Sequence, residues 1–381
     1  MNILMLGTDA SPFKGEQGGG NTLDRLSRYL NALSAHEPQS TITSLVYTSE
    51  NIQAFSPSKN MYFIPVRVPK VQFYPFAGVV AAGRIIKSRP PDVITTQNAF
   101  EVGVLGIFLQ KIAKTPVEIQ VHLDFSSCYW LRERPFWNRI RRIIARWVLL
   151  QADVVRVVST PIKTFLVEQW RLPEDKISVI PVPVFYSREG KGKAIFDLAP
   201  KSSPLVLFIG RLCYQKNLPA LLTIMKDVSE KKPETKFVVI GDGPLRHWFV
   251  NEVNKASLSQ CKILGALPYN ELMAWYRQAN VTILPSLYEG FGRVIMESYL
   301  QQTPAVATRC GGPEDIIRDG ETGFLTAIED MKLFAERVLW LLEHPTEARE
   351  MGERGFLWVK QRFHPDELVE RMTGQWLSLK A

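Results

Sequence analysis

Short apolar runs alternate with longer amphipathic stretches through most of the chain. The runs are rich in Val, Ile and Leu, and the segments between them are long enough to form helices. We predict strands at residues 2–6, 41–46, 92–95, 117–121, 154–158, 205–209, 236–240, 262–264, 281–284 and 304–308. Continuous apolar strands of this kind are typical of parallel sheets whose two faces are both covered by helices. The pattern therefore predicts an α/β fold.

The same pattern starts twice along the chain. Residues 181–200, between the two halves, are rich in Pro, Gly and charged residues, which is typical of a linker. Each half begins with a strand that runs into a glycine, Gly7 in the first and Gly210 in the second. A length of 381 residues also exceeds what one ordinary core can support. We predict two doubly wound, Rossmann-like domains, residues 1–183 and 201–364, joined by a linker at 184–200 and facing a central cleft.

Composition narrows the class of protein. Hydrophobic residues make up 46% and charged residues 22%, as in ordinary globular proteins. No apolar run approaches the roughly 20 residues of a membrane span, and the apolar start lacks the basic region of a signal peptide. The cysteines show neither a C-x-x-C spacing nor clustering with histidines, which argues against a zinc site or a disulfide framework and suits a reducing cytoplasm. They are Cys128, Cys213, Cys261 and Cys310.

The net charge of +8 is unevenly distributed. Residues 1–180 hold 21 Lys and Arg against 14 Asp and Glu, whereas the remainder holds 25 against 24. This excess suggests an anionic partner for the first half: a membrane surface, a phospholipid-linked acceptor or a nucleic acid. A solvated basic face without a partner is an equally good interpretation.

The strongest candidate for a binding site lies in the second half, where residues 284–298 read LPSLYEGFGRVIMES. A predicted strand runs into a loop, and Gly290-Phe291-Gly292 then opens a helix. Ligands of open parallel sheets bind beyond the carboxyl ends of the strands. A helix that begins there offers unpaired backbone N–H groups and its positive dipole end to a phosphate. We therefore predict that this loop contacts a phosphorylated ligand.

Two carboxylates accompany the loop. Glu297 follows Glu289 by eight residues, which would separate them by about 12 Å if the whole stretch were helical. This is wider than the roughly 5–9.5 Å between the paired carboxyl groups of glycosidases. We interpret the two glutamates as hydrogen-bond acceptors for different hydroxyl-bearing parts of one ligand. The alternative is a solvated pair, one capping a helix and one on its surface.

Two further motifs end strands of the second half. Residues 208–217 read FIGRLCYQKN, which places Arg211 and Lys216 beside a strand end, where two cations suit a pyrophosphate. Residues 239–244 read VIGDGP, so Gly241 and Gly243 follow the next strand in a tight turn. A G-x-G sequence alone is more often a simple turn.

In the first half, residues 15–21 read GEQGGGN, after the first strand and before a helix predicted near Thr22. Such a loop can hold a phosphate with backbone N–H groups. It lacks the P-loop and dinucleotide patterns, which disfavours an NTPase or a dehydrogenase. His122 follows the strand at 117–121, with Asp124 two residues later. A lone histidine is more often structural, so its functional role rests on context.

With these motifs in place, the second half resembles the glycosyltransferase family 4 group, retaining enzymes of GT-B fold. The similarity spans residues 204–326 and includes FIGRL, QKN, VVIGDGPL, ILPSLYEGFGRVIMES, TPAVATRCGGPEDII and DGETGFL. The first half is similar only loosely. The resemblance implies a hexosyltransferase that moves a sugar from a UDP- or GDP-sugar to a hydroxyl of a glycan or lipid-linked acceptor. It also implies a role in cell-surface polysaccharide or glycolipid biosynthesis, and that the helix at 365–381 packs back on the first domain.

Residue roles follow from the resemblance. Arg211 and Lys216 would hold the donor diphosphate, Glu289 would accept from a sugar hydroxyl, Glu297 would accept from the ribose, and His122 would lie near the sugar. The residues implied in catalysis are His122, Arg211, Lys216 and Glu289. Those implied in donor binding are Gly18, Gly19, Gly210, Arg211, Lys216, Gly241, Gly243, Leu264, Gly265, Glu289, Gly290, Phe291, Gly292, Arg293 and Glu297. No metal or other cofactor is expected, because cations and a helix end can stabilise the leaving group. Front-face substitution, the mechanism usual for this group, requires no nucleophilic carboxylate.

A basic amphipathic segment suggests a membrane contact. Residues 137–150 read WNRIRRIIARWVLL, and a helix of this kind can lie on an anionic bilayer. Nearby aromatic residues are candidates to frame an acceptor: Phe73, Tyr74, Phe76, Tyr129 and Trp130. We predict a cytoplasmic protein that associates reversibly with the inner face of the membrane. The alternative is a helix that faces the core and exposes its arginines to solvent.

Two other functions are compatible with parts of this pattern. A sugar-nucleotide epimerase of GT-B fold would bind the same donor but form product without an acceptor. A non-catalytic nucleic-acid-binding protein is suggested only by the pI near 9.2. The chain has no RNP-like aromatic pattern, zinc knuckle or recognition motif, so we expect no nucleic-acid partner.

Overall fold

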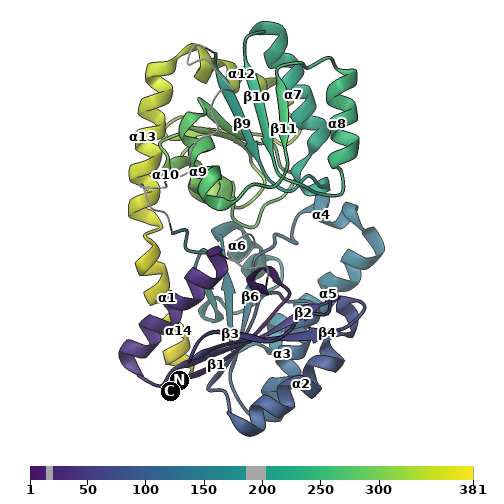
Figure 1. Ribbon diagram of the computed structural model, residues 1–381, viewed down its shortest axis with the longest axis vertical. Coiled ribbons are helices and arrows are strands. Elements are labelled where there is room, and N and C mark those ends of the chain that lie inside the picture. Colours follow the sequence, from purple (N-terminus) through teal and green to yellow (C-terminus); the bar gives the residue numbers. More distant parts are fainter. Residues whose placement is uncertain (14–19, 186–202, 381) are drawn as a thin grey trace. The chain divides into compact units, whose positions relative to one another are not determined.

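Each half of the chain builds its own sheet in the computed structural model, which describes residues 1–13, 20–185 and 203–380 (Figure 1). Unit 1 consists of Met1–Ser126, Arg134–Phe185 and Pro365–Ala381, and unit 2 of Ser127–Glu133 and Tyr186–His364. Gly18, Gly19 and nearly all of the predicted linker lie outside the described residues.

The sheet of unit 1 has eight strands in the order β3-β4-β2-β1-β5-β6-β7-β8. All neighbouring pairs are parallel except β3 and β4. The strand order reverses between β1 and β5, as in doubly wound folds. The strands are β1 (Asn2–Gly7), β2 (Thr41–Thr48), β3 (Phe55–Ser58), β4 (Met61–Arg67), β5 (Val93–Thr96), β6 (Val117–Val121), β7 (Val154–Val157) and β8 (Ile177–Val179). The helices are α1 (Gly20–His36), α2 (Tyr74–Ser88), α3 (Glu101–Ala113), α5 (Pro135–Gln151), α6 (Thr160–Glu168) and α14 (Pro365–Lys380).

The sheet of unit 2 has six parallel strands in the order β11-β10-β9-β12-β13-β14, which reverses between β9 and β12. The strands are β9 (Leu205–Ile209), β10 (Lys236–Ile240), β11 (Cys261–Leu264), β12 (Val281–Leu284), β13 (Ala305–Thr308) and β14 (Gly323–Thr326). The α-helices are α4 (Cys128–Glu133), α7 (Leu218–Lys231), α8 (Arg246–Lys255), α9 (Tyr269–Gln278), α10 (Arg293–Leu300), α11 (Pro313–Ile316), α12 (Met331–Glu343) and α13 (Pro345–Arg362).

Successive side chains of β9 pack on opposite faces of this sheet. Val206 and Phe208 join a core formed with helices α7 and α12, while Leu207 and Ile209 join a second core formed with α9. Side chains alternate along a strand, so a strand buried on both faces is apolar throughout. This explains why continuous apolar runs predicted the parallel sheets correctly.

All ten predicted strands are present, and the two-sheet α/β architecture is confirmed. Sequence reasoning missed β3, β4, β8 and β14. Strand β4 contains Pro65, and β14 directly follows the turn at Gly320. Strand β8 has only three residues. Proline and glycine are typical of turns and loops, so these segments did not read as strands. A three-residue strand is too short to show a pattern of apolar positions.

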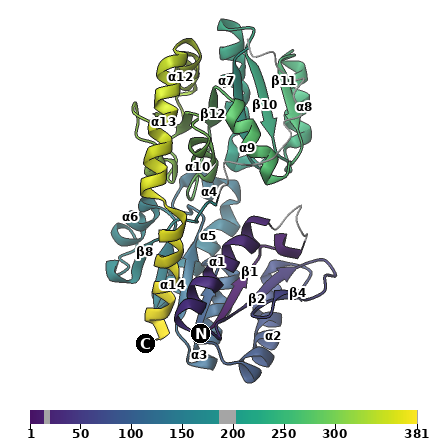
Figure 2. The same ribbon diagram turned by 60° about the vertical axis from the view of Figure 1, so that its left-hand side comes forward.

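The last helix, α14, belongs to unit 1 and packs beside α1 (Figure 2). The ring of Trp376 lies edge-on to Tyr29, 5.4 Å between centroids. Its Nε1–H donates to the carboxylate of Glu118 on β6 at 3.0 Å, and Gln375 donates to the other oxygen of this carboxylate. Glu118 is fully buried. Hydrogen bonds to a buried carboxylate therefore hold the end of the chain on the sheet.

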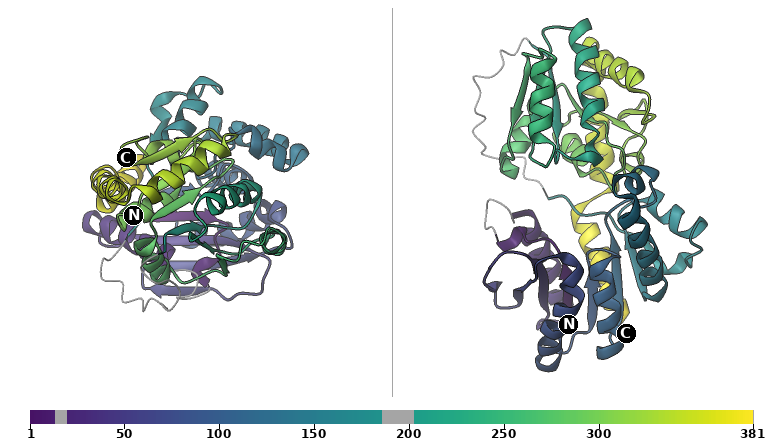
Figure 3. Two further views of the ribbon diagram at one scale, coloured as in Figure 1. Left: turned by 90° about the horizontal axis from the view of Figure 1, so that it is seen from above. Right: turned by 90° about the vertical axis from the view of Figure 1, so that its right-hand side faces the viewer.

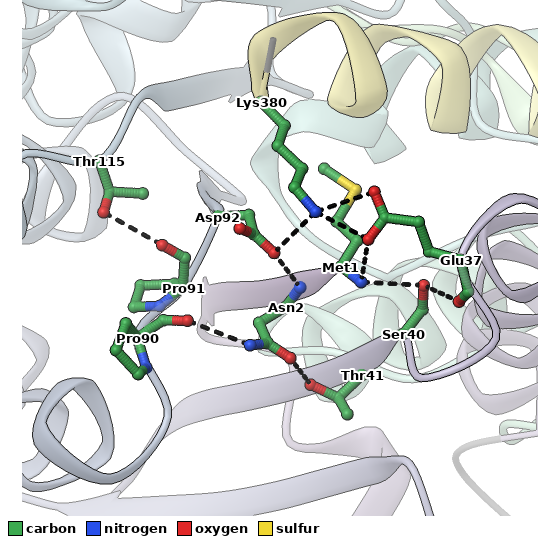
Figure 4. Close-up of polar contacts among 10 residues, drawn as sticks. All are labelled: Met1, Asn2, Glu37, Ser40, Thr41, Pro90, Pro91, Asp92, Thr115 and Lys380. Carbon is green, nitrogen blue, oxygen red and sulfur yellow. Dashed lines mark hydrogen bonds and ion pairs between the residues drawn. The ribbon is translucent and has the colours of Figure 1, made fainter.

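Both ends of the chain lie in unit 1 (Figures 1 and 3). The amino group of Met1 lies 2.6 Å from a carboxylate oxygen of Glu37, and Lys380 Nζ lies 2.7 Å from the same oxygen (Figure 4). Lys380 also lies 3.7 Å from Asp92. Hydrogen bonds from Lys380 and the amino terminus lower the pKa of Glu37 to about 2.

Among the described residues, no helix has both the length and the hydrophobicity needed to cross a membrane.

Candidate functional site

The residues of the second-half motifs gather at the carboxyl ends of β9 and β12. These strands are neighbours in the sheet, and the strand order reverses between them. The chain leaves β9 in one direction and β12 in the other. Doubly wound folds bind their ligands at such a reversal. Lys216 follows β9 on the short 3-10 helix η4 (Tyr214–Lys216), and Glu289 follows β12.

Lys216 and Glu289 form an ion pair at this edge of the sheet. Their charged atoms are in direct contact, and the two residues are 8% and 7% exposed. Ser286 Oγ donates to the same carboxylate oxygen at 2.7 Å, and Gln215 donates to the backbone carbonyl of Tyr288 at 2.9 Å. A carboxylate held by several donors in a buried site keeps a fixed orientation. The pair thus presents a cation and an oriented acceptor side by side.

Glycines give this edge of the sheet its close packing. A side chain on Gly210 would meet the stem of Lys216 at 3.1 Å, so the absence of a side chain leaves room for the lysine. Gly241 has φ +142°, and a Cβ there would lie 2.0 Å from the carbonyl oxygen of Gly210. A Cβ on Gly243 would lie 2.4 Å from the carbonyl of Leu212. The turns after β9 and β10 therefore approach each other through backbone alone.

The loop after β12 ends at the start of α10. Gly292 precedes the helix with φ +91°, a conformation that residues with a side chain rarely adopt. Gly312 permits the backbone after β13 to approach Phe291, whose Cα would lie 2.2 Å from an added Cβ. Within the described chain, the N–H groups of Gly290 and Phe291 have no protein acceptor. They remain available at a helix start, where an anion is stabilised.

Glu297 lies on α10 and is 4% exposed. It accepts from Tyr276 Oη at 3.0 Å and from Arg293 Nε at 2.7 Å, and the Arg293 guanidinium lies over the Tyr269 ring. Burial works against a charged guanidinium, but the charge and hydrogen bond of Glu297 outweigh it and raise the pKa of Arg293. The result is a second oriented carboxylate on the same side of the sheet edge.

The structure shows that the helical spacing considered for this motif does not apply, and it excludes the alternative of solvated glutamates. Glu289 is not helical: it pairs in a β-bridge with Gly311, and α10 begins only at Arg293. The helical spacing assumed between Glu289 and Glu297 therefore does not apply. Neither glutamate is solvated, since both are buried. The Phe291 side chain packs against Phe363 in the core, so Phe291 offers only its backbone to a ligand.

The remaining second-half candidates lie on the same edge. Arg211 follows β9 with an exposed side chain, which forms no ion pair with any described residue. Leu264 ends β11, and the carbonyls of Leu264 and Gly265 both accept from the N–H of Gly241 at 3.2 Å. An added Cβ on Gly265 would meet no atom within 4 Å, so the space beside it is open.

His122 lies in unit 1, directly after β6, and is half-buried. Its Nε2 lies 2.9 Å from Gln120 Oε1, which also accepts from Arg156 at 3.1 Å. An amide oxygen only accepts, so Nε2 carries the proton and Nδ1 is left as an acceptor. Burial, together with the charges of Arg156 and Arg25, holds the pKa of His122 well below its usual 6.5. His122 is therefore neutral near pH 7 and lines a small cavity of about 30 Å³.

Sequence reasoning missed several supporting residues. Ser286 and Gln215 lie inside the motifs that were identified, next to the pair they hold. Tyr276 comes from α9, and no local pattern connects it with Glu297. Two aromatic candidates for an acceptor face inward instead: Tyr74 is buried and donates to the carbonyl of Leu45, and Trp130 is buried.

Metal binding is not suggested by the part of the chain that the structure describes. No three His, Cys, Asp or Glu side chains come together there as a metal site would require. The four cysteines are free thiols.

Comparisons with known proteins agree with the two-sheet fold and identify a family. Residues 18–188 match the model described as Glycosyltransferase Family 4, and residues 193–358 match Glycosyl transferases group 1. The chain is 29% identical to the 2-deoxystreptamine N-acetyl-D-glucosaminyltransferase of Niallia circulans over 269 residues, 68% of this chain and 69% of that protein. Sucrose-phosphate synthase from Thermosynechococcus elongatus has a similar fold, with a TM-score of 0.86 at 20% identity over 100% of this chain and 99% of that one. Anabaena HepE in complex with UDP-glucose gives 0.74 at 18% identity, over 99% of both chains.

Proposed function

Because the chain belongs to the glycosyltransferases of the group 1 and family 4 type, we propose that it is a retaining hexosyltransferase that uses a UDP- or GDP-sugar. The acceptor would be a hydroxyl of a glycan or of a lipid-linked sugar, in cell-surface polysaccharide or glycolipid biosynthesis. The observation that carries this proposal is the Lys216–Glu289 pair at the reversal between β9 and β12. A UDP-sugar is favoured because a relative of the same fold was solved with UDP-glucose.

The donor diphosphate would bind beside Lys216. A leaving nucleoside diphosphate gains negative charge as the glycosidic bond breaks, and a fixed cation stabilises that charge more than it stabilises the ground state. Arg211 has an exposed guanidinium at the same strand end that can reach a phosphate. The N–H groups of Gly290 and Phe291 add donors at a helix start. These groups can supply the stabilisation that a divalent metal gives elsewhere, so we propose catalysis without a metal.

The two glutamates would orient the ends of the donor. Glu289 has Lys216 and Ser286 on one carboxylate oxygen, and its other oxygen has only a weak 3.4 Å contact with Gln215. That oxygen can accept from a hydroxyl of the sugar. Glu297 would accept from the ribose. A carboxylate already engaged by a buried lysine is a poor nucleophile, which favours front-face substitution over a covalent intermediate.

We also propose that unit 1 binds the acceptor and associates with the cytoplasmic face of an anionic membrane. Helix α5 supports this, because it exposes Phe136, Trp137, Ile143, Trp147 and Leu150 together with Arg139 and Arg146. Exposed aromatic and aliphatic residues beside cations are the composition of an interfacial helix.

The first experiment is a thermal titration of the purified protein, without metal, against UDP, GDP, ADP and their sugar conjugates. A ligand that binds only the folded state adds about 2.7 kcal/mol at a hundredfold excess over Kd. We expect one nucleotide series to raise the Tm of the wild type and to raise it much less in Lys216→Ala and Glu297→Ala. Absence of any shift at saturating nucleotide would contradict the proposed donor site. Product formed without an acceptor would identify an epimerase instead.

A further inference from the structure

A large apolar pocket lies in unit 1, and none of the strand-end residues described above lines it. It has a volume of about 660 Å³ and lies between α2, α3 and α5, which pack side by side (Figure 1). This volume is in the range of about 300–1,000 Å³ found for small-molecule sites. Its walls are mainly hydrocarbon and include Phe76 and Val79 of α2, Val104 and Phe108 of α3, and Trp137 and Ile144 of α5. The pocket therefore suits an apolar ligand.

The pocket is open to solvent along its apolar wall. Phe76, Phe108 and Trp137 line it and are 76%, 51% and 54% exposed. Soluble proteins rarely leave large contiguous apolar surface uncovered unless it binds something. The one acidic residue in the lining, Glu101, is neutralised by Arg141 at 2.7 Å. Arg134 also lines the pocket, so its one excess charge is positive, and its entrance is broad and apolar.

The surroundings of the pocket are cationic. Helices α2, α3 and α5 together hold seven Lys and Arg but a single acidic residue, the paired Glu101. On each helix an exposed cation lies one turn from an exposed apolar side chain: Arg84 from Val80, Lys111 from Phe108, and Arg139 from Ile143. Long basic side chains can lay their stems on apolar surface and keep their charges at the level of phosphates. An anionic head group with a hydrocarbon tail matches both features.

We propose that this pocket binds one acyl chain of an anionic phospholipid from a membrane leaflet, with the surrounding cations at the phosphates. The acyl chain would leave the bilayer and enter between α2, α3 and α5. The inserted acyl chain, and not surface charge alone, would then hold the protein on the membrane. This inference rests on the proposed membrane association and adds a specific lipid-chain site to it.

The test compares two matched substitutions. Val104→Phe places a ring in the pocket, whereas Val80→Phe adds the same ring on the exposed face of α2 outside it. Partition is measured by co-sedimentation with phosphatidylcholine vesicles, with and without phosphatidylglycerol. We expect Val104→Phe to lower the partition coefficient about tenfold, equivalent to roughly two buried methylene groups. Val80→Phe should bind at least as tightly as the wild type. Equal binding of both variants and the wild type would contradict the binding of an acyl chain in the pocket. The protein would then associate with the membrane through its surface alone.

A second measurement reports the position of the lipid acyl chain. Phosphatidylglycerol brominated on its acyl chains quenches a tryptophan that it touches, and Trp137 lines the pocket. We expect quenching in the wild type that is largely lost in Trp137→Phe and in Val104→Phe, with Trp147→Phe as the control on the same helix. Quenching that survives in Val104→Phe would overturn the proposal, as would a solution dimer that covers the pocket and excludes vesicles. The nucleotide-dependent rise in Tm is recorded on the same samples, so loss of lipid binding is distinguished from failure of the proposed sugar transfer.

Discussion

The buried charges beside the two sheets of this protein have opposite surroundings. In unit 2, Lys216, Glu289 and Glu297 lie at the edge where the strand order reverses, and free backbone N–H groups lie in the same loop as Glu289. In unit 1, the carboxylate of Glu118 turns inward and accepts from Thr95, Gln120 and Trp376. The comparison indicates that the partners of a buried charge separate one that serves the fold from one that we propose serves a ligand. Unit 2 keeps unused donors, whereas Glu118 is surrounded by donors from the protein itself.

The largest expected effect is on transfer, in Lys216→Ala. Loss of one preorganised group that stabilises transition-state charge typically costs about 10²–10³ in kcat. Truncation also leaves Glu289 buried without its partner, which costs about 3–5 kcal/mol of stability for a broken buried pair. We therefore expect kcat to fall by that factor per folded molecule, measured with a saturating donor, and the Tm to fall as well.

Lys226→Ala is the matched control for this variant, because Lys226 is exposed on α7 in the same unit. It should leave both kcat and Tm nearly unchanged. A Lys216→Ala enzyme that keeps its rate within a fewfold of the wild type would show that the buried pair is structural, as the Glu118 network is.

The next effect in size is on donor binding, in Glu297→Ala. If this carboxylate accepts from ribose hydroxyls, its loss should weaken nucleotide binding by about 10–100-fold, as for a hydrogen bond to a charged group of about 1.5–3 kcal/mol. The Kd for the nucleotide, measured by calorimetry, is the direct readout. Glu336→Gln, an exposed position on α12, provides the control. An unchanged Kd would assign Glu297 to the support of Arg293 and Tyr276 only.

A smaller effect on stability, with none on the donor, is expected for Glu118→Gln. The substitution keeps the volume but removes a charge that accepts from Trp376 and Gln375 of α14, at a cost of about 1.5–3 kcal/mol. Urea unfolding should show this loss, and the exposed Glu168→Gln should not. Nucleotide affinity should stay within twofold. If the affinity for the nucleotide fell together with stability, the Glu118 network and the proposed donor site would be coupled. The contrast drawn between them would then not hold.

The two regions also differ in how far the sequence predicts them. The ends of β9, β10 and β12 carry contiguous motifs, as expected if these loops contact a ligand with their own backbone, which needs glycines and charges within a few residues. Those motifs located Lys216, Glu289 and Glu297. Tyr276 and Trp376 could not be found in this way, since they reach their carboxylates from distant helices through tertiary packing. The apolar strands were predicted because burial on both faces leaves a continuous run, but β4 and β14 were hidden by proline and glycine.

The smallest expected effect concerns His122, the candidate site residue that follows β6 in unit 1. Its pKa lies well below 6.5 in the folded protein, so the unfolded chain binds a proton more readily. Stability from the neutral imidazole is therefore fully present above the unfolded pKa near 6.5 and is lost as the pH falls below it. We expect the Tm of the wild type to decline between pH 7 and pH 5 more steeply than that of His122→Gln. The difference should be smaller than the effects of the other variants, since His122 is only partly buried. Equal slopes would mean that folding does not shift the pKa of His122, so that the imidazole gains its charge between pH 7 and pH 5 in the folded protein as it does in the unfolded chain. In that case unit 1 would present a charge beside β6 at low pH, and the contrast between the two sheets would rest on Glu118 alone.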